Sequence, residues 1–199
     1  MSPATDMLTF LGTAGARLMV ASQILASGGL WLELGGTQIL LDPGPGTLVQ
    51  ATKRKLRASK LDAIVLSHRH LDHSADANVM IEAMTDGGLR RRGTLFAPRD
   101  ALEDDPVVLH YLRSYLDNIE ILEAGKSYNI GEVTLKDPHQ APPRRGDLWG
   151  DFRQPEAYHL LHRGHPLFPG AMFSLSGRPC YCERGQAGVR SSLRPPLGA

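Results

Sequence analysis

The sequence predicts an α/β fold, because short apolar runs of strand length alternate with segments of helical spacing as far as about residue 136. The 199 residues suffice for one globular domain with a sizeable core and are too few for two large domains. Three histidines and an aspartate lie between His68 and His73, directly after the buried-strand pattern Leu61–Leu66. Loops that follow strands usually present ligands in mixed folds, so we expect the chemistry there.

Charge and cysteine content say little about partners. Charged residues are 22% of the chain and the formal net charge is +1, so composition does not support a nucleic-acid partner. Cys180 and Cys182 give no basis for a disulfide framework and fit a reducing compartment. Residues 1–6 lack the pattern of a signal peptide, and no stretch approaches the roughly 18–20 apolar residues of a membrane span. We therefore expect a cytoplasmic protein with no membrane partner; the oligomeric state stays open.

The chain begins with strands joined by glycine-rich turns. Residues 7–12 form an apolar run that Gly12 stops, which predicts a first strand. The apolar runs Leu30–Leu34 and Gln38–Leu41 flank Gly35-Gly36-Thr37, and this pattern predicts a hairpin.

Asp42 opens the rigid segment Asp42-Pro43-Gly44-Pro45-Gly46, which ends the second strand of that hairpin. A carboxylate at this point suits a supporting position beside a metal site. The alternative is an aspartate that bonds its own backbone in the turn, and spacing alone does not decide between the two. Thr47 is expected to cap a helix over residues 48–52.

Alternation continues after the histidine cluster. Residues 74–76 can cap a helix with apolar positions from Val79 to Met84, which Asp86-Gly87-Gly88 stops. Further elements are expected in this order: a strand over 93–97, a helix from Asp105 to Tyr115 that contains His110 as a structural or surface histidine, and strands over 119–122 and 133–135. The basic run Leu89-Arg90-Arg91-Arg92 reads as a solvated face, with an anionic-substrate contact as the alternative.

Residues 68–73 carry the chemistry. Neutral imidazole suits zinc, iron, copper or nickel, and a carboxylate adds a hard oxygen ligand. His68 and His70, two residues apart on an extended loop, can converge on one ion, while Asp72 and His73 can reach a second. Arg69 and Leu71 should then point away from the ions. The alternative, a run of solvent-facing histidines, fits poorly with the preceding buried strand.

Ser67-His68-Arg69-His70-Leu71-Asp72-His73 resembles the His-x-His-x-Asp-His signature of the metallo-β-lactamase fold superfamily. The Leu-Leu-Asp-Pro-Gly-Pro-Gly segment at residues 40–46 also agrees, and the resemblance covers about residues 7–136. It implies an αβ/βα sandwich with metals at one edge. By that resemblance the first ion is held by His68 and His70 and the second by Asp72 and His73.

The same resemblance implies that Asp72 also orients an attacking hydroxide and that Asp42 takes a supporting position. It implies zinc as the cofactor, two ions in the intact family, with iron or manganese as alternatives. Superfamily members hydrolyse lactams, thioesters and phosphodiesters, so the signature gives a mechanism class and not a substrate.

The sequence departs from the family from residue 137 onward. Residues 1–136 read as a metallo-β-lactamase-like part, and residues 137–199 as a Pro/Gly/Arg-rich irregular tail. The family completes its site with histidines and an aspartate from its second half. The corresponding residue types here stand in no family context, so metal binding should be weak: His139, His159, His162, His165, Asp147 and Asp151. We expect the sandwich to be incomplete in its second half.

We hypothesise that this tail is a frame-shifted reading of the family's C-terminal half. With synonymous codons and the first base dropped, residues 137–152 permit a strand-like segment with histidines. In the same register, residues 158–170 permit an aspartate after an apolar strand, and residues 179–185 permit a buried strand. Sequencing the gene around the Lys136 codon tests this hypothesis.

These observations predict a metal-dependent hydrolase that acts on a small-molecule ester-type substrate, with a phosphodiester favoured because of Arg90-Arg91-Arg92. The alternative from another class is a catalytically inactive metal-binding or regulatory domain that keeps only the first-half ligands.

Overall fold

The structure is a computed structural model that describes residues 6–13, 17–23, 25–103, 105–123 and 125–136, and three short strands within 159–174. The first sheet has six strands in sequence order: β1 (Met7–Phe10), β2 (Leu30–Leu34), β3 (Thr37–Leu41), β4 (Ala63–Val65), β5 (Thr94–Pro98) and β6 (Asn118–Leu122). Strands β1 to β3 are antiparallel, whereas β3 to β6 run parallel. This mixed sheet confirms the predicted α/β class.

The predicted hairpin is present between β2 and β3. Gly35 and Gly36 have φ values of 56° and 88°, so both residues of the turn are left-handed. Such turns match the twist of antiparallel strands, and glycine adopts them without a steric cost.

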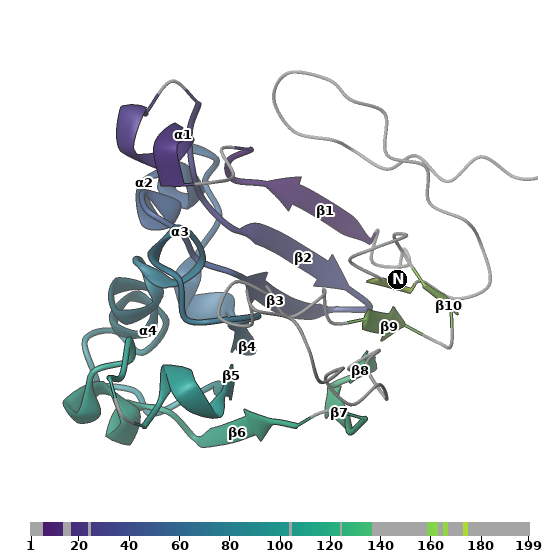
Figure 1. The fold of residues 1–199 in the computed structure, drawn as a ribbon. Helices are drawn as coiled ribbons and strands as arrows, with labels where there is room; N and C mark the ends of the chain where they lie inside the picture. The colour runs from purple at the N-terminus through teal and green to yellow at the C-terminus, as the bar shows by residue number, and fades with distance from the viewer. Residues whose placement is uncertain are drawn as a thin grey trace, which may run out of the picture.

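Helices cover one face of the first sheet (Figure 1). They are α1 (Arg17–Ser22), α2 (Thr47–Lys53), α3 (Leu71–Ser74) and α4 (Ala77–Met84), with 3-10 turns η1 (Ala58–Lys60), η2 (Arg99–Ala101) and η3 (His110–Tyr115). Trp31 and Ile64 of the sheet share one buried cluster with Met80 of α4 and Leu112 of η3. Burial of these side chains fixes α4 and η3 against the sheet.

A second sheet packs on the opposite face (Figure 1). It consists of β7 (Ser127–Ile130), β8 (Val133–Lys136), β9 (His159–His162), β10 (His165–Pro166) and β11 (Phe173–Ser174). Ile130, Val133 and Leu135 bury their side chains with Val65 and Phe96 of the first sheet. The described residues therefore form a helix–sheet–sheet stack, and β9 to β11 are strands within the segment predicted to be irregular.

The predicted helix from Asp105 to Tyr115 is wrong over its first half, and only η3 forms, beginning at His110. The side chain of Asn78 explains the difference: its Nδ2 donates to the Val107 carbonyl at 2.8 Å and its Oδ1 accepts from the Leu109 amide at 2.9 Å. These bonds occupy backbone groups that a helix would need. His110 is exposed on η3, as expected of a surface histidine.

Thr47 does not cap α2, contrary to the prediction. Gly46 occupies the cap position with φ of 85°, and Thr47 is the first helical residue. Its buried hydroxyl donates to the Gly44 carbonyl at 2.7 Å and accepts from the Gly29 amide at 3.1 Å, so it connects the Gly44 turn to the segment directly before β2. The sequence patterns also did not predict α1 and β7. None of the helices in the described ranges is long and apolar enough to cross a membrane.

Candidate metal centre

Two neighbouring parallel strands bring the polar residues together. Asp42 follows β3 and Ser67 follows β4, and the Asp42 amide donates to the Val65 carbonyl at 2.9 Å. The carboxyl ends of parallel strands lie at the same edge of a sheet, so side chains that follow them meet there. The shared direction of β3 and β4 thus places Asp42 and Ser67, 25 positions apart, within hydrogen-bonding distance.

The turn after Asp42 holds α3 in place. The Asp76 amide donates to the Pro43 carbonyl at 2.9 Å. Gly44 lies so close to α3 that a Cβ atom there would overlap the backbone carbonyl of Asp72. Within α3, the Ser74 hydroxyl is in donor position to the carbonyls of Arg69 and His70 at 3.0 Å each, which ties the helix to the loop that precedes it. Gly44 therefore has a packing reason to be glycine, which the sequence pattern of the turn did not reveal.

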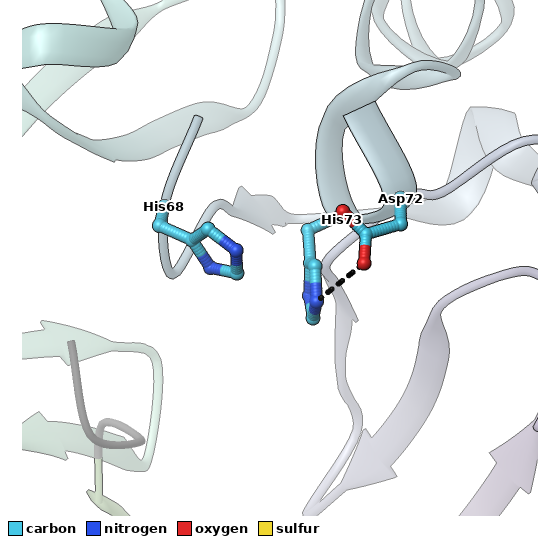
Figure 2. Close-up of side chains that lie close together, drawn as sticks. All are labelled: His68, Asp72 and His73. Atoms are coloured by element: carbon cyan, nitrogen blue, oxygen red, sulfur yellow. Dashed lines mark ion pairs between the residues drawn. The ribbon is translucent and has the colours of Figure 1, made fainter. Parts of the chain in front are cut away.

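Figure 2 shows His68 on the loop after β4 facing Asp72 and His73 on α3. One potential ligand atom from each of these three residues lies within 4.8 Å of the other two. The exposed fraction is 6% for His68, whereas the His73 side chain is 31% exposed. The Nε2 atom of His73 lies 3.6 Å from Oδ2 of Asp72. Three of the four predicted ligands are thus gathered in one place.

Asp42 is the hub of the hydrogen bonds behind this cluster. Its Oδ1 accepts from the Ser67 amide at 2.7 Å, and its Oδ2 accepts from the Ser67 hydroxyl at 2.6 Å. The same Oδ2 lies 3.0 Å from Nδ1 of His73. This geometry suits the supporting position expected of Asp42. Among the described residues, the Asp42 carboxylate bonds to Ser67 and His73 rather than to the backbone of its own turn, which is closed by the Gly44 amide donating to the Asp42 backbone carbonyl at 2.8 Å.

These bonds fix which nitrogen of each imidazole is free for a ligand. Because Ser67 gives its one hydroxyl proton to Asp42, it accepts at 2.9 Å from a protonated Nδ1 of His68. His73 likewise donates from Nδ1 to Asp42. Nε2 is left as the lone-pair atom of both rings in their neutral forms, which is the arrangement that carboxylate-oriented metal ligands show. Ser67 thus links Asp42 to the His68 ring, a role that the sequence pattern did not predict.

His68 Nε2 is buried and has no hydrogen-bond partner within the part of the chain that the structure describes. A buried nitrogen without a partner costs free energy unless something else satisfies it. Two imidazole nitrogens and one carboxylate oxygen are the donor set that zinc accepts with an open position. The residues present therefore fit a divalent metal ion of the zinc type.

The pKa values of His68 and His73 are shifted in opposite directions. Burial lowers the pKa of His68 from its ordinary value, and the positive charge of nearby His73 adds to that effect. Burial opposes protonation of His73 too, but its hydrogen bond to Asp42 and the charges of Asp42 and Asp72 together raise its pKa. His68 is therefore the ring more readily available as a neutral ligand, whereas His73 keeps its proton to a higher pH and a metal ion competes with that proton.

His70 lies beside this group and outside it. Its ring centroid is 4.8 Å from that of His68 in an edge-on arrangement, and it is not among the three residues whose ligand atoms converge. Arg69 and Leu71 point elsewhere, as expected: Arg69 pairs with Asp105 at 3.0 Å, and Leu71 is 67% exposed.

The second-half candidates are described only in part. His139, Asp147 and Asp151 lie outside the described residues, and His159, His162 and His165 are described only as the backbone of β9 and β10. The basic run before β5 is largely structural: Arg91 and Arg92 donate to backbone carbonyls of Leu116, Ser59 and Leu61. It therefore gives no support to an anionic substrate.

Comparison with known proteins gives a consistent family. The family model described as "Beta-lactamase superfamily domain" matches residues 37–155. The chain is similar to the uncharacterized protein MJ1374 of Methanocaldococcus jannaschii, at 30% identity over 147 residues, 72% of this chain and 54% of that protein. It is similar to ribonuclease Z of Kineococcus radiotolerans at 35% identity over 96 residues, 48% of this chain and 30% of that enzyme. The chain thus spans about half of the first of these relatives and under a third of the second.

Among solved structures, the metallo-beta-lactamase fold protein YhfI from Bacillus subtilis superposes with a TM-score of 0.57 at 20% identity. The superposition covers 80% of this chain and 59% of that protein, and it confirms the fold.

The expectation of a small-molecule substrate without nucleic acid is contradicted by several ribonuclease Z relatives, including those of Methanopyrus kandleri and Thermoplasma volcanium. The prediction failed because a net charge of +1 measures the field of the whole chain, whereas a nucleic acid can be bound by a few local groups.

Proposed function

The chain belongs to the beta-lactamase superfamily domain family, and from that premise we propose that it is a metal-dependent hydrolase of phosphodiester bonds in RNA. The relatives named ribonuclease Z support the RNA substrate. The proposed hydrolytic chemistry rests on one observation: the convergence of ligand atoms from His68, Asp72 and His73 around a buried, unpartnered nitrogen.

Each residue has a proposed task that follows from its contacts. His68 and His73 would hold the ion through Nε2, since Nδ1 of each ring is engaged by Ser67 and Asp42 respectively. Asp72 would add a carboxylate oxygen beside Nε2 of His73. The resemblance assigned His70 to the same ion as His68 and gave Asp72 and His73 to a second ion. In the structure His68 converges with Asp72 and His73 instead, and His70 lies edge-on to His68 outside that group, so we propose no direct ligand role for His70. We propose zinc as the metal, because the donor set is nitrogen-rich with one carboxylate.

When bound, such an ion supplies a Lewis acid for the phosphoryl group and lowers the pKa of water. The chain's own residues supply the rest. Asp42 and Ser67 hold the imidazole rings with Nε2 toward one point, so the ligands need little reorganisation. The sheet edge keeps His68 buried, which limits competition from bulk water.

The test is a substrate panel with the zinc-loaded full chain: a labelled RNA oligonucleotide, DNA of the same sequence, a thioester and a lactam. We expect cleavage of RNA, loss of it in Asp72→Asn, and retention in His110→Gln, which alters an exposed histidine away from the cluster. Turnover of the thioester alone would overturn the proposed substrate.

The inactive metal-binding alternative has a specific observation in its favour, because only three ligand groups converge among the described side chains. A second arm addresses it: a chain translated with the shifted frame after Lys136, compared with the present one. Under the frame-shift proposal the shifted chain binds zinc more tightly and gains activity. Stoichiometric zinc in both chains without hydrolysis of any panel member would favour the binding domain.

A further inference from the structure

A cavity of about 720 Å³ opens beside the metal centre, between α1, α3 and the segment 105–107. Asp72 of the candidate centre and the neighbouring His70 form part of its lining, and Arg69 and Asp105 add one positive and one negative charge. The remaining wall is mostly apolar and includes Val20, Leu71, Ala75, Pro106 and Val107. Cavities of roughly 300–1,000 Å³ with an apolar wall and few polar groups are typical of small-ligand sites, and a nucleotide fits this range.

Arg69 is held only loosely by its partner. Its Nη2 lies 3.0 Å from Oδ2 of Asp105, but the two side chains are 37% and 86% exposed. Such exposed pairs contribute about 0–1 kcal/mol, so the guanidinium can exchange this carboxylate for another anion at little cost.

The ion pair is not needed to fasten the segment that carries Asp105. Asn78 already bonds Val107 and Leu109 at 2.8 and 2.9 Å, and the Val107 amide donates to the Ala101 carbonyl at 3.1 Å. The Arg69 guanidinium is therefore not required to hold this segment. It faces the cavity that Asp72, a proposed metal ligand, also lines, so it is available for binding. Its planar fork matches two phosphate oxygens.

We propose that this cavity binds the nucleotide next to the scissile bond of the RNA, with Arg69 on its phosphate and the apolar wall against its base. The inference rests on the proposed function and deepens it by assigning a phosphate subsite. Asp105 then acts as the internal competitor that the phosphate displaces from Arg69. Arg69 thus becomes a binding residue, although its place between two histidines of the signature predicted only that it points away from the ions.

The test measures binding of adenosine 5′-monophosphate, with adenosine as the comparison ligand, to the metal-free full chain by NMR titration or calorimetry. Arg69→Gln should weaken monophosphate binding roughly 10- to 100-fold, the loss expected for a charge-assisted hydrogen bond, and leave adenosine binding unchanged. Asp105→Asn should tighten monophosphate binding by up to about fivefold, because it removes the competing carboxylate. Arg99→Gln is the matched control, since Arg99 also forms an exposed ion pair, with Glu103, outside the cavity lining.

Three results would overturn the proposal: no monophosphate binding by the unaltered chain, equal weakening by Arg69→Gln and Arg99→Gln, or loss of adenosine binding in Arg69→Gln. Because these measurements use neither metal nor turnover, they separate the subsite from the proposed hydrolase activity. Absence of RNA cleavage with intact monophosphate binding would refute the activity and leave the subsite standing.

Discussion

Two polar clusters flank the parallel strands β4 and β5, one after the end of β4 and the other before the start of β5. After β4, His68 and His73 turn Nε2 toward a shared point, and His68 Nε2 has no partner among the described residues. Before β5, both Nη atoms of Arg92 donate to the carbonyls of Ser59 and Leu61, and Nε of Arg91 donates to that of Leu116. Nε of Arg92 is also buried without a partner among the described residues, so a lone unpartnered nitrogen does not distinguish the two clusters. In the first cluster the unpartnered nitrogen belongs to a group of three converging ligand residues, whereas in the second the neighbouring donors bond to backbone carbonyls of the fold.

The difference shows that residue type and clustering do not by themselves identify a site. Both runs are dense in groups that bind ions, and both lie beside the same sheet. The two clusters differ in which groups their donors and acceptors contact, and this can be read only from the hydrogen-bond partners in the structure. The following predictions test this separation.

The largest effect should come from His68→Gln. The change removes the buried nitrogen ligand and should lower zinc affinity more than about 100-fold, since it exceeds the 10–100-fold typical of outer-shell changes. Competition with a fluorescent zinc chelator measures it. His110→Gln, the exposed-histidine control, should leave affinity unchanged; equal losses in both variants would place the metal elsewhere.

Asp42→Asn should have the next largest effect, a loss of about 10–100-fold in zinc affinity. Asp42 has φ of 50°, and asparagine tolerates this conformation, so the backbone should hold while the charge behind Ser67 and His73 is lost. The same chelator competition, with circular dichroism to confirm the fold, measures it. Unchanged affinity would show that Asp42 serves the turn only.

Arg92→Met should affect stability and spare the metal centre. Losing the bonds to Ser59 and Leu61 leaves carbonyls short of a partner, which we expect to cost about 1–3 kcal/mol of unfolding free energy. Arg90→Gln, whose side chain is 79% exposed, should stay within about 0.5 kcal/mol. Urea unfolding gives both values, and zinc affinity should be equal in the two variants. A loss of zinc affinity in Arg92→Met but not in Arg90→Gln would contradict the prediction that Arg92 does not contribute to the metal centre.

The smallest effect concerns pH in the metal-free chain. The raised pKa of His73 stabilises the fold fully below the unfolded value near 6.5, and this contribution fades as pH rises through the folded pKa. His68 has a lowered pKa, so the folded state favours its neutral ring. It therefore destabilises the fold as pH falls below about 6.5. Zinc binding should strengthen as pH rises, because the His73 proton must leave.

NMR titration of the imidazole protons checks these directions. In the unaltered chain His73 should titrate above 6.5 and His68 below it. In Asp42→Asn, burial should dominate and bring the His73 pKa down. A His73 pKa that Asp42→Asn leaves unchanged would contradict the assigned hydrogen bond.

Much of the fold follows from local patterns. The apolar runs Leu30–Leu34 and Leu61–Leu66 and the turn at Gly35-Gly36 were sufficient to predict β2, β4 and the hairpin. The helix predicted from Asp105 failed because Asn78, 29 residues away from Val107, takes the backbone groups that a helix would use. No local pattern can show such a competitor.

By itself, the sequence determined the α/β class, the place of the cluster after a buried strand, and the histidine and carboxylate chemistry of residues 68–73, because each depends on neighbouring residues. Only the tertiary structure decided that Asp42 bonds both Ser67 and His73, that Gly44 must leave room for the Asp72 backbone, and that Arg91 and Arg92 serve the fold. It also placed Arg69 in a cavity shared with His70 and Asp72. These are contacts between segments distant in the chain, and they exist only once the strands are aligned and the turns are closed.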